Sequence, residues 1–101
     1  MKKTSALTVY SQTGQSSNQI VIHPNDGFDL GLMSLNYPAD IYSKISVDDF
    51  QKGSSQAVTG SIRLENNCRP GTIELGVKYW KELGKPETVI LYYDEGKLLV
   101  S

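Results

Sequence analysis

The chain has 101 residues, of which 39% are hydrophobic and 21% are charged; this is the composition of one small globular domain and argues against wholesale disorder. Its longest apolar runs, such as Val89 to Tyr93, are too short to span a bilayer, so no membrane segment is predicted. The net charge is −1, so overall attraction cannot explain an affinity for nucleic acid, and a DNA-binding role would need locally placed cations.

Residues 1–19 are predicted to form a polar arm. Its one apolar alternation, Ala6 to Tyr10, is expected to become a strand only if another strand pairs with it. The basic start of the chain is not followed by the apolar stretch that a secretion signal needs. The single cysteine, Cys68, excludes an internal disulfide and a cysteine-based zinc site, so a reducing, cytoplasmic setting is expected.

Residues 20–57 are predicted to be a β-rich N-terminal extension. Ile20 to Ile22 is a strand candidate with three β-branched residues, and residues 23–27 have the composition of a turn. Residues 28–35 are compatible with either a strand or a helical turn, and both alternatives stay open. Asn36 to Pro38 is predicted to interrupt regular secondary structure.

An extended segment is expected to resume over residues 41–47. Ser46 and Asp49 resemble a helix-capping pair, which indicates a short turn over residues 48–52. Residues 51–60 have the composition of a linker, so we place an internal boundary there and begin the next module at residue 58.

Residues 58–101 carry the clearest pattern. Val77, Tyr79, Trp80 and Leu83 recur at intervals of three and four residues, as on one face of a helix, and the glycine and proline that follow are a usual helix stop. The elements predicted are, in order, a strand at 61–65, a polar turn at 66–71, a strand at 72–75, a helix from 77 to 83, a strand at 88–93, a hairpin turn at 94–96 and a strand at 97–101.

This order of elements resembles the swapped-hairpin family of AbrB-like transition regulators and MazE-like antitoxins. That family has an alternating strand, a short helix ending in Leu-Gly, and two further strands joined by a turn with glycine. The resemblance covers residues 62–101 and rests on Ile73 and Leu75 in the strand, Leu83 and Gly84 at the helix end, Val89 and Leu91 in the next strand, Gly96 in the turn, and Leu98 and Val100 in the last strand.

The resemblance implies a mainly β fold with one short helix, in the α+β class, built as a barrel-like module from two interleaved chains. A homodimer is also expected on physical grounds, because a segment of about forty residues is near the lower limit for an independent core and its strands present open edges. Residues 20–31 can be aligned with residues 73–84 as a degenerate copy, but the helical periodicity is missing there, so a tandem architecture is not predicted.

The resemblance also assigns DNA contacts to four residues: Arg63, Asn66, Asn67 and Arg69. Arginine can bond guanine or phosphate with two donors, and asparagine can bond adenine or the backbone. The alternative is that the asparagines are ordinary turn residues and the arginines are solvated surface charges. Residues 61–101 contain six basic and six acidic residues, so they lack the basic excess typical of a DNA reader.

No enzyme, cofactor or metal is predicted. His23 is the only histidine and has no further histidine or cysteine near it in the sequence, so neither a metal site nor a catalytic triad is indicated. Cys68 lies beside an arginine that could activate a thiolate, but no base accompanies it. Asp48 and Asp49 are explained by turn and capping roles.

Two functions of different classes remain. The first is a small homodimeric DNA-binding transcription regulator or antitoxin, with duplex DNA as a partner and any toxin-like protein bound through residues 1–60. The second is a non-enzymatic protein-binding module without DNA affinity, such as a phage-type inhibitor, an immunity protein or an assembly subunit. The sequence identifies neither the operator nor the partner protein.

Overall fold

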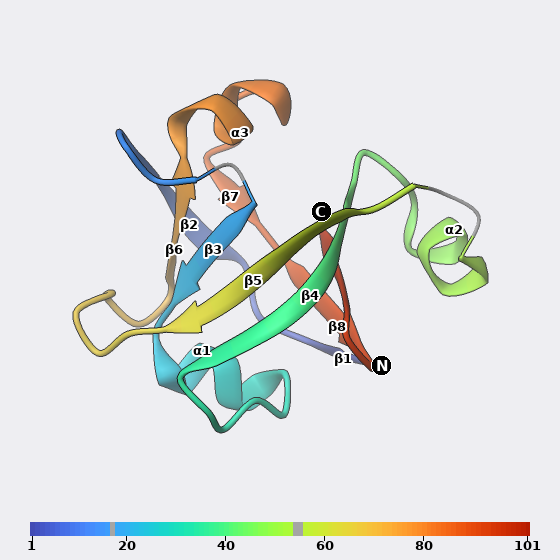
Figure 1. The fold of residues 1–101 in the computed structure, drawn as a ribbon, viewed down its shortest axis with the longest axis horizontal. Helices are drawn as coiled ribbons and strands as arrows, with labels where there is room; N and C mark the ends of the chain where they lie inside the picture. Colours follow the sequence, from blue (N-terminus) through green and yellow to red (C-terminus); the bar gives the residue numbers. More distant parts are fainter. Residues whose placement is uncertain (17, 54–55) are drawn as a thin grey trace.

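The computed structural model describes residues 1–16, 18–53 and 56–101, and in this part of the chain it contains one mainly β sheet with three short helices (Figure 1). The mainly β class predicted from the sequence is therefore confirmed. The helices are α1 (Pro24–Asp29), α2 (Val47–Lys52) and α3 (Val77–Glu82); the strands are β1 (Lys2–Lys3), β2 (Leu7–Gln12), β3 (Gln19–Ile22), β4 (Asn36–Ser43), β5 (Val58–Leu64), β6 (Thr72–Gly76), β7 (Thr88–Val89), β8 (Leu91–Asp94) and β9 (Lys97–Val100). No helix in the described ranges has the length and apolar content needed to cross a membrane.

The strands follow the order β1-β8-β9-β4-β5-β3-β6-β2-β7 in one curled sheet. The two ends of this order come together because β7 and β8 are consecutive in the chain, separated only by Ile90. At that break the backbone of Ile90 pairs with the backbone of Ser101 instead. The sheet therefore curls into a half-barrel that encloses the core (Figure 1).

The sheet contains two similar units whose strands interleave. In the first, β2 is followed by β3, α1 and β4; in the second, β5 is followed by β6, α3 and β7. β2 pairs in parallel with β6 of the other unit, and β5 pairs in parallel with β3. In these two parallel pairs Thr8 of β2 lies beside Thr72 of β6, and Gln19 of β3 lies beside Ser61 of β5. Thr8 is therefore equivalent to Ser61, and Gln19 to Thr72, so equivalent positions of the two units are 53 residues apart.

The repeat extends through the helices. Helices α1 and α3 have six residues each, and each is followed by Leu-Gly with the glycine at positive φ, Gly31 at 78° and Gly84 at 89°. Residues 20–31 thus correspond to residues 73–84 in the structure, although no tandem architecture was predicted from their alignment. In the last strand of each unit, Pro38 pairs with Ser61 and Thr88 pairs with Thr8. Pro38 is therefore equivalent to Thr88, at a spacing of 50 residues and not 53. The first unit thus has three more residues than the second between its helix and its last strand.

The C-terminal strands find their partners in the N-terminal half of the same chain. β9 pairs in parallel with β4, β8 pairs with β1, and β7 pairs with β2. The three segments predicted as an arm, an extension and a module, residues 1–19, 20–57 and 58–101, thus all contribute strands to one sheet. Within the predicted linker at 51–60, Gln51 and Lys52 belong to α2 and residues 58–60 belong to β5, whereas residues 54 and 55 lie outside the described residues.

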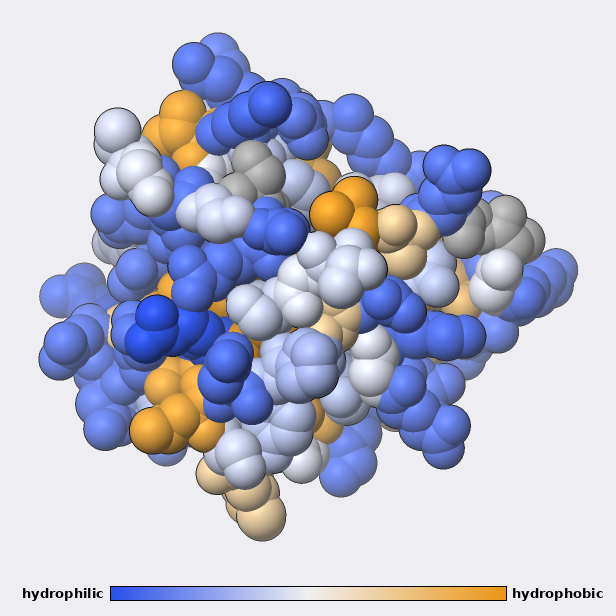
Figure 2. Space-filling view, in the orientation of Figure 1, coloured by the Kyte–Doolittle hydropathy of each residue, from blue (hydrophilic) through white to orange (hydrophobic). Residues whose placement is uncertain are grey.

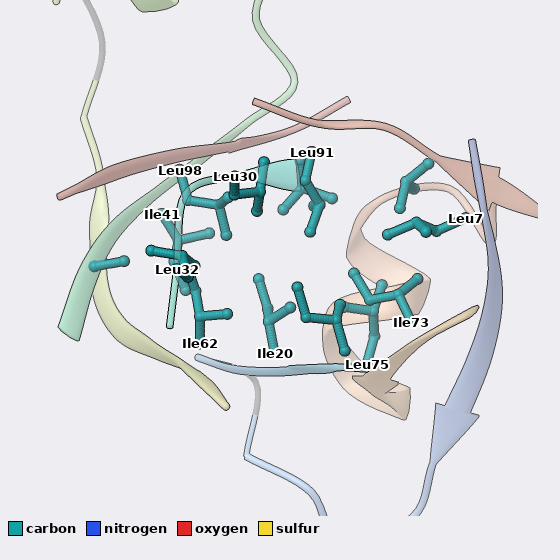
Figure 3. Close-up of a cluster of buried hydrophobic side chains, with 14 of the residues drawn as sticks. Leu7, Ile20, Leu30, Leu32, Ile41, Ile62, Ile73, Leu75, Leu91 and Leu98 are labelled. Atoms are coloured by element: carbon teal, nitrogen blue, oxygen red, sulfur yellow. The ribbon is translucent and has the colours of Figure 1, made fainter. Parts of the chain in front are cut away.

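The core is a single apolar interior enclosed by the curled sheet. Figure 3 shows side chains from both units pointing into it, among them Ile20 of β3 and Leu75 of β6, which are 0% exposed and stand opposite each other in antiparallel register. The continuous apolar run of β3 is buried along its length, with Ile20, Val21 and Ile22 no more than 4% exposed. Tyr79 of α3 is also buried, which raises the pKa of its phenol.

Three local predictions are corrected by the structure. Residues 23–27 were expected to form a turn, but the helix α1 begins at Pro24, where proline suits the first helical position, and Nδ1 of His23 accepts a hydrogen bond from the Asn25 N–H at 3.0 Å. Asn36 to Pro38 does not interrupt the secondary structure but forms the start of β4. The strand expected over 88–93 is divided at Ile90 into β7 and β8.

The remaining local predictions are confirmed with small changes of boundary. Ser46 caps α2, with its Oγ accepting from the Asp49 N–H at 3.1 Å. The alternation around Ala6 to Tyr10 becomes β2 because β6 and β7 pair with it on its two sides. The strands and the helix expected between residues 61 and 83 are present as β5, β6 and α3.

Candidate functional site

The four residues assigned to DNA contact lie at the β5–β6 end of the sheet. Arg63 is near the end of β5, while Asn66, Asn67 and Arg69 lie in the loop to β6, and all four are exposed. Arg63, Asn66 and Asn67 line the same shallow hollow of about 300 Å³, and Arg69 is not among its lining residues. The structure thus brings three of the four predicted residues together.

The charge of Arg63 is partly used within the chain. Its guanidinium Nη2 lies 2.9 Å from Oε1 of Glu65, and the two side chains are 48% and 38% exposed. An exposed ion pair of this kind contributes at most about 1 kcal/mol. A ligand that contacts Arg63 therefore also meets the carboxylate of Glu65. This disfavours binding of a polyanion such as DNA and is compatible with the polar rim of a protein interface.

The β5–β6 loop is held against α1. The Gly71 N–H donates to Oδ2 of Asp26 at 2.9 Å, and Asp26 is only 7% exposed. A turn within the loop is closed by the Cys68 N–H donating to the Glu65 carbonyl at 3.1 Å. α1 itself packs tightly on β5, since a Cβ at Gly27 would come within 2.6 Å of the Leu64 side chain. The loop and α1 thus form one connected end of the molecule.

Three large apolar side chains are exposed at this same end. Phe28 of α1 is 64% exposed, and Met33 and Leu35, in the connection from α1 to β4, are 78% and 71% exposed. Figure 2 shows hydrophobic surface at the lower left and at the bottom of the view, where Figure 1 places this connection. Of these three, Leu35 also lines the hollow that contains Arg63, Asn66 and Asn67, so it shares a surface with these polar residues. We call these seven residues the recognition end: Phe28, Met33, Leu35, Arg63, Asn66, Asn67 and Arg69.

The exposed connection has a fixed conformation. The phenol oxygen of Tyr37 accepts hydrogen bonds from the backbone N–H groups of Met33 at 2.7 Å and Ser34 at 2.8 Å. These bonds, the one from Ser34 first, lower the pKa of Tyr37 because they stabilise its ionised form. The ring packs against the core. Two residues without regular structure are therefore presented by an anchored tyrosine, which reduces the ordering entropy that binding would cost.

The Tyr37 anchor gives a local prediction. In Tyr37→Phe the two N–H groups lose their acceptor, so hydrogen exchange at Met33 and Ser34 should accelerate by about fivefold to tenfold. Tyr10→Phe is the matched control, because the phenol of Tyr10 is 47% exposed and makes no hydrogen bond with any residue the structure describes. Residue-resolved exchange measured by NMR checks this; equal rates at Met33 and Ser34 in wild type and Tyr37→Phe would mean that the phenol does not hold the connection.

Cys68 supports the loop from inside. Its thiol is 1% exposed and lies 3.5 Å from Oγ1 of Thr72. Burial raises the pKa of Cys68, and the contact with Thr72 lowers it by less. The group is a buried thiol with a structural role, which agrees with the sequence interpretation that Arg69 does not make it a reactive cysteine.

The raised pKa of Cys68 predicts a loss of stability at alkaline pH. Because the folded pKa lies above the unfolded one, the stabilising contribution is fully present below the ordinary thiol pKa of about 8.5 and is lost as the pH rises through the folded pKa. Urea unfolding between pH 7 and 10 measures this, and the decline should be shallower in Cys68→Ala. Identical slopes for the two proteins would contradict the assignment.

In the described ranges, no group of three or more histidine, cysteine, aspartate or glutamate residues is placed to hold a metal ion. His23 instead caps α1. The exposed cluster was not predicted from the sequence, because Met33 and Leu35 belong to an apolar run that is equally typical of a buried element. They lie in the connection from α1 to β4, which is three residues longer than its counterpart in the second unit.

Comparisons with protein-family models, with curated proteins and with solved structures find no match for this chain. The geometry of the chain itself therefore has to carry any functional proposal.

Proposed function

We propose that the protein is a small non-enzymatic binding module that recognises a protein partner through the recognition end. The observation that carries this proposal is that α1 and its connection to β4 expose three large apolar side chains, Phe28, Met33 and Leu35, each more than 60% exposed. One of them, Leu35, lines the hollow of the β5–β6 loop. Exposed apolar residues grouped beside polar ones are typical of protein interaction sites. The partner expected is a protein with an apolar centre and a rim that can bond the two asparagine side chains.

The surrounding charges favour a protein partner over a polyanion. Arg63 is paired with Glu65, and the net charge of the chain is −1. Binding at such a surface derives mainly from apolar anchors, with hydrogen bonds fixing their orientation. The Tyr37 anchor supports this role, because it presents Met33 and Leu35 in one conformation before any partner binds.

A second candidate function is the DNA-binding regulator implied by the swapped-hairpin resemblance. It is favoured by the exposure of Asn66, Asn67 and Arg69 on one loop. Arg69 forms no ion pair with the residues that the structure describes, so its charge is free for a phosphate. Under this proposal, the two interleaved units of one chain take the places that two chains occupy in the family, and a homodimer would serve to present two recognition ends.

One set of variants separates the two candidates. Met33→Asp combined with Leu35→Asp places charge in the apolar cluster, and Val58→Asp is the control because Val58 is 60% exposed on β5 away from this end. A protein captured from cells that produce this chain should bind wild type and Val58→Asp alike, and should bind the double variant at least about tenfold more weakly. Equal capture by all three proteins would contradict the protein-binding proposal.

The DNA-binding candidate makes the opposite prediction. Affinity for duplex DNA should fall steeply with increasing salt concentration, and Arg69→Ala should make that fall less steep. The Met33→Asp, Leu35→Asp double variant should lose affinity only through repulsion between its added negative charges and the duplex, and this loss should shrink at higher salt concentration. If no duplex binds wild type even at low salt, this candidate is wrong. The solution mass tests the predicted homodimer separately, since the described strands already complete the core within one chain.

A further inference from the structure

The two units differ at the starts of their equivalent helices. At the 53-residue spacing His23, which precedes α1, is equivalent to Gly76, which precedes α3. Nδ1 of His23 accepts a hydrogen bond from the Asn25 N–H at 3.0 Å, whereas Gly76 has no side chain with which to cap its helix. A titratable group therefore caps the helix of the first unit only, and the second unit provides an internal comparison.

The imidazole of His23 is the only partner of the Asn25 N–H among the described residues. Pro24 has no N–H, and the N–H groups of Asp26 and Gly27 both donate to the His23 carbonyl, at 2.9 Å and 3.0 Å. The donors of the first turn are therefore all satisfied, and one of them depends on the ring nitrogen. Because a ring nitrogen that accepts a hydrogen bond cannot carry a proton, this cap requires the neutral ring with its hydrogen on Nε2.

No charged group in the described part of the chain forms an ion pair with His23. The Glu65 N–H donates to the carbonyl of the residue before His23 at 3.0 Å, but the Glu65 carboxylate pairs with an arginine. Oδ2 of Asp26 accepts from the Gly71 N–H. The hydrogen bond to Asn25 is therefore the described contact of the ring that depends on its protonation. The charged residues on the elements around His23 are Asp26 and Asp29 of α1, Arg63 and Glu65 at the end of β5, Arg69 in the β5–β6 loop and Glu74 of β6.

The start of α1 is connected to both parts of the recognition end. α1 follows β3 almost directly (Figure 1), and Phe28 lies on α1 itself. Oδ2 of Asp26 holds the β5–β6 loop through the Gly71 N–H at 2.9 Å. The Leu32 N–H donates to the Gly27 carbonyl at 2.9 Å, so the connection to β4 also begins on this helix. Since α1 has only six residues, fewer than two turns, a change in its first turn affects most of its length.

We propose that His23 is a pH-sensitive cap that loosens the start of α1, and with it the recognition end, as the pH falls through the range of about 8 to 5 in which histidine takes up its proton. The imidazolium has donors on both nitrogens and no acceptor, so the bond from the Asn25 N–H is lost. A positive charge beside a helix N-terminus is also unfavourable. The stabilising contribution of the cap is therefore present at the higher pH and is lost as the pH falls. This inference rests on the proposed function, because it assigns a regulation to the same site.

The test is a titration of the full-length, isotope-labelled protein between about pH 8 and pH 5, followed by NMR. The ¹⁵N shifts of the His23 ring should place the hydrogen on Nε2 in the neutral form. The amide signals of Asn25, Phe28 and Gly71 should move with the same midpoint as the His23 ring. The amide signals at the start of α3 should not move with that midpoint, because the equivalent residue there is Gly76.

Two variants separate the cap from the other titrating groups. His23→Asn supplies a side-chain acceptor at every pH, and His23→Ala supplies none. Between pH 8 and pH 5 the folding equilibrium constant of wild type should fall by about fivefold relative to that of His23→Asn, as expected for the loss of one side-chain cap. At pH 5 wild type should retain no advantage over His23→Ala. Urea unfolding at each pH measures these constants.

Each outcome bears on the proposal. A common midpoint at His23, Asn25, Phe28 and Gly71, with a fivefold loss in wild type that is absent from both variants, would support it. A neutral ring with its hydrogen on Nδ1, an equal pH dependence in wild type and His23→Asn, or a response that stops at Asn25 would overturn it. None of these readouts needs a partner protein, so failure of the cap leaves the protein-binding proposal standing, and failure of that proposal leaves the titration unchanged.

Discussion

Replacing Leu75 with alanine is expected to lower the free energy of unfolding by about 3–4 kcal/mol, because the change removes buried methyl groups and leaves a cavity between packed strands. Leu75 is 0% exposed, and its strand, β6 of the second unit, lies between β3 and β2, which both belong to the first unit. Its neighbour across the antiparallel pair, Ile20, is equally buried. The side chain therefore joins the two units at the centre of the core, where the surrounding strands cannot easily collapse.

Leu35→Ala is the matched control for this prediction. The same side chain is removed, but Leu35 is 71% exposed, so the free energy of unfolding should change by no more than about 0.5 kcal/mol. Chemical denaturation of wild type and both variants measures the difference. A similar small effect for Leu75→Ala and Leu35→Ala would show that Leu75 does not lie in a packed core.

Gly60→Ala is expected to destabilise the protein by about 3 kcal/mol, the upper range for overpacking. A Cβ at Gly60 would stand 2.1 Å from the Asn18 carbonyl oxygen and 2.6 Å from Cδ1 of Ile41. The Asn18 carbonyl is backbone and already accepts a hydrogen bond from the Ser61 N–H at 2.9 Å. The Asn18 carbonyl cannot move away without breaking this bond between β5 and the residue before β3.

Gly14→Ala separates this steric effect from the general cost of replacing glycine. Gly14 has a φ of 85° but nothing lies within 4 Å of an added Cβ, so only the left-handed conformation is penalised, by about 1–2 kcal/mol. Denaturation curves of the two variants provide the comparison. If Gly60→Ala costs no more than Gly14→Ala, the close approach of β5 to Asn18 is wrong.

The elements of the C-terminal half could be predicted because their signals are local. Tyr79 and Leu83, four residues apart, lie on the core-facing side at α3, and Gly84 and Pro86 follow its end. Ser46 similarly identifies the start of α2 through a bond only three residues long. These patterns depend on neighbours in the sequence and not on the rest of the fold.

The errors in the N-terminal half also have physical causes. Pro24 and His23 were assigned to a turn, but proline at the first helical position and an acceptor before it are equally a helix start. Pro38 lies in a strand because β4 pairs with β9 only from Asp40 onward, so proline has a strand on one side alone. Local composition does not reveal which strand edge is unpaired.

The interleaving of the two units could not be predicted from local patterns. The parallel pairs β2 with β6 and β3 with β5 join strands that are far apart in the sequence, and no turn links them. The repeat left few identical residues, chiefly Ile20 with Ile73 and the two Leu-Gly pairs. The four polar residues of the candidate site were identified by resemblance, whereas the apolar cluster required knowledge of which leucines the sheet leaves outside.

Interleaving of two units within one chain is tested most directly by isotope-filtered NOE spectroscopy on protein refolded from an equal mixture of labelled and unlabelled chains. The structure predicts strong contacts between β2 and β6, such as Tyr10 beside Glu74, and between β3 and β5 within labelled chains only. Contacts at these positions between labelled and unlabelled chains would instead mean that two chains exchange strands, and the self-contained fold described here would be wrong.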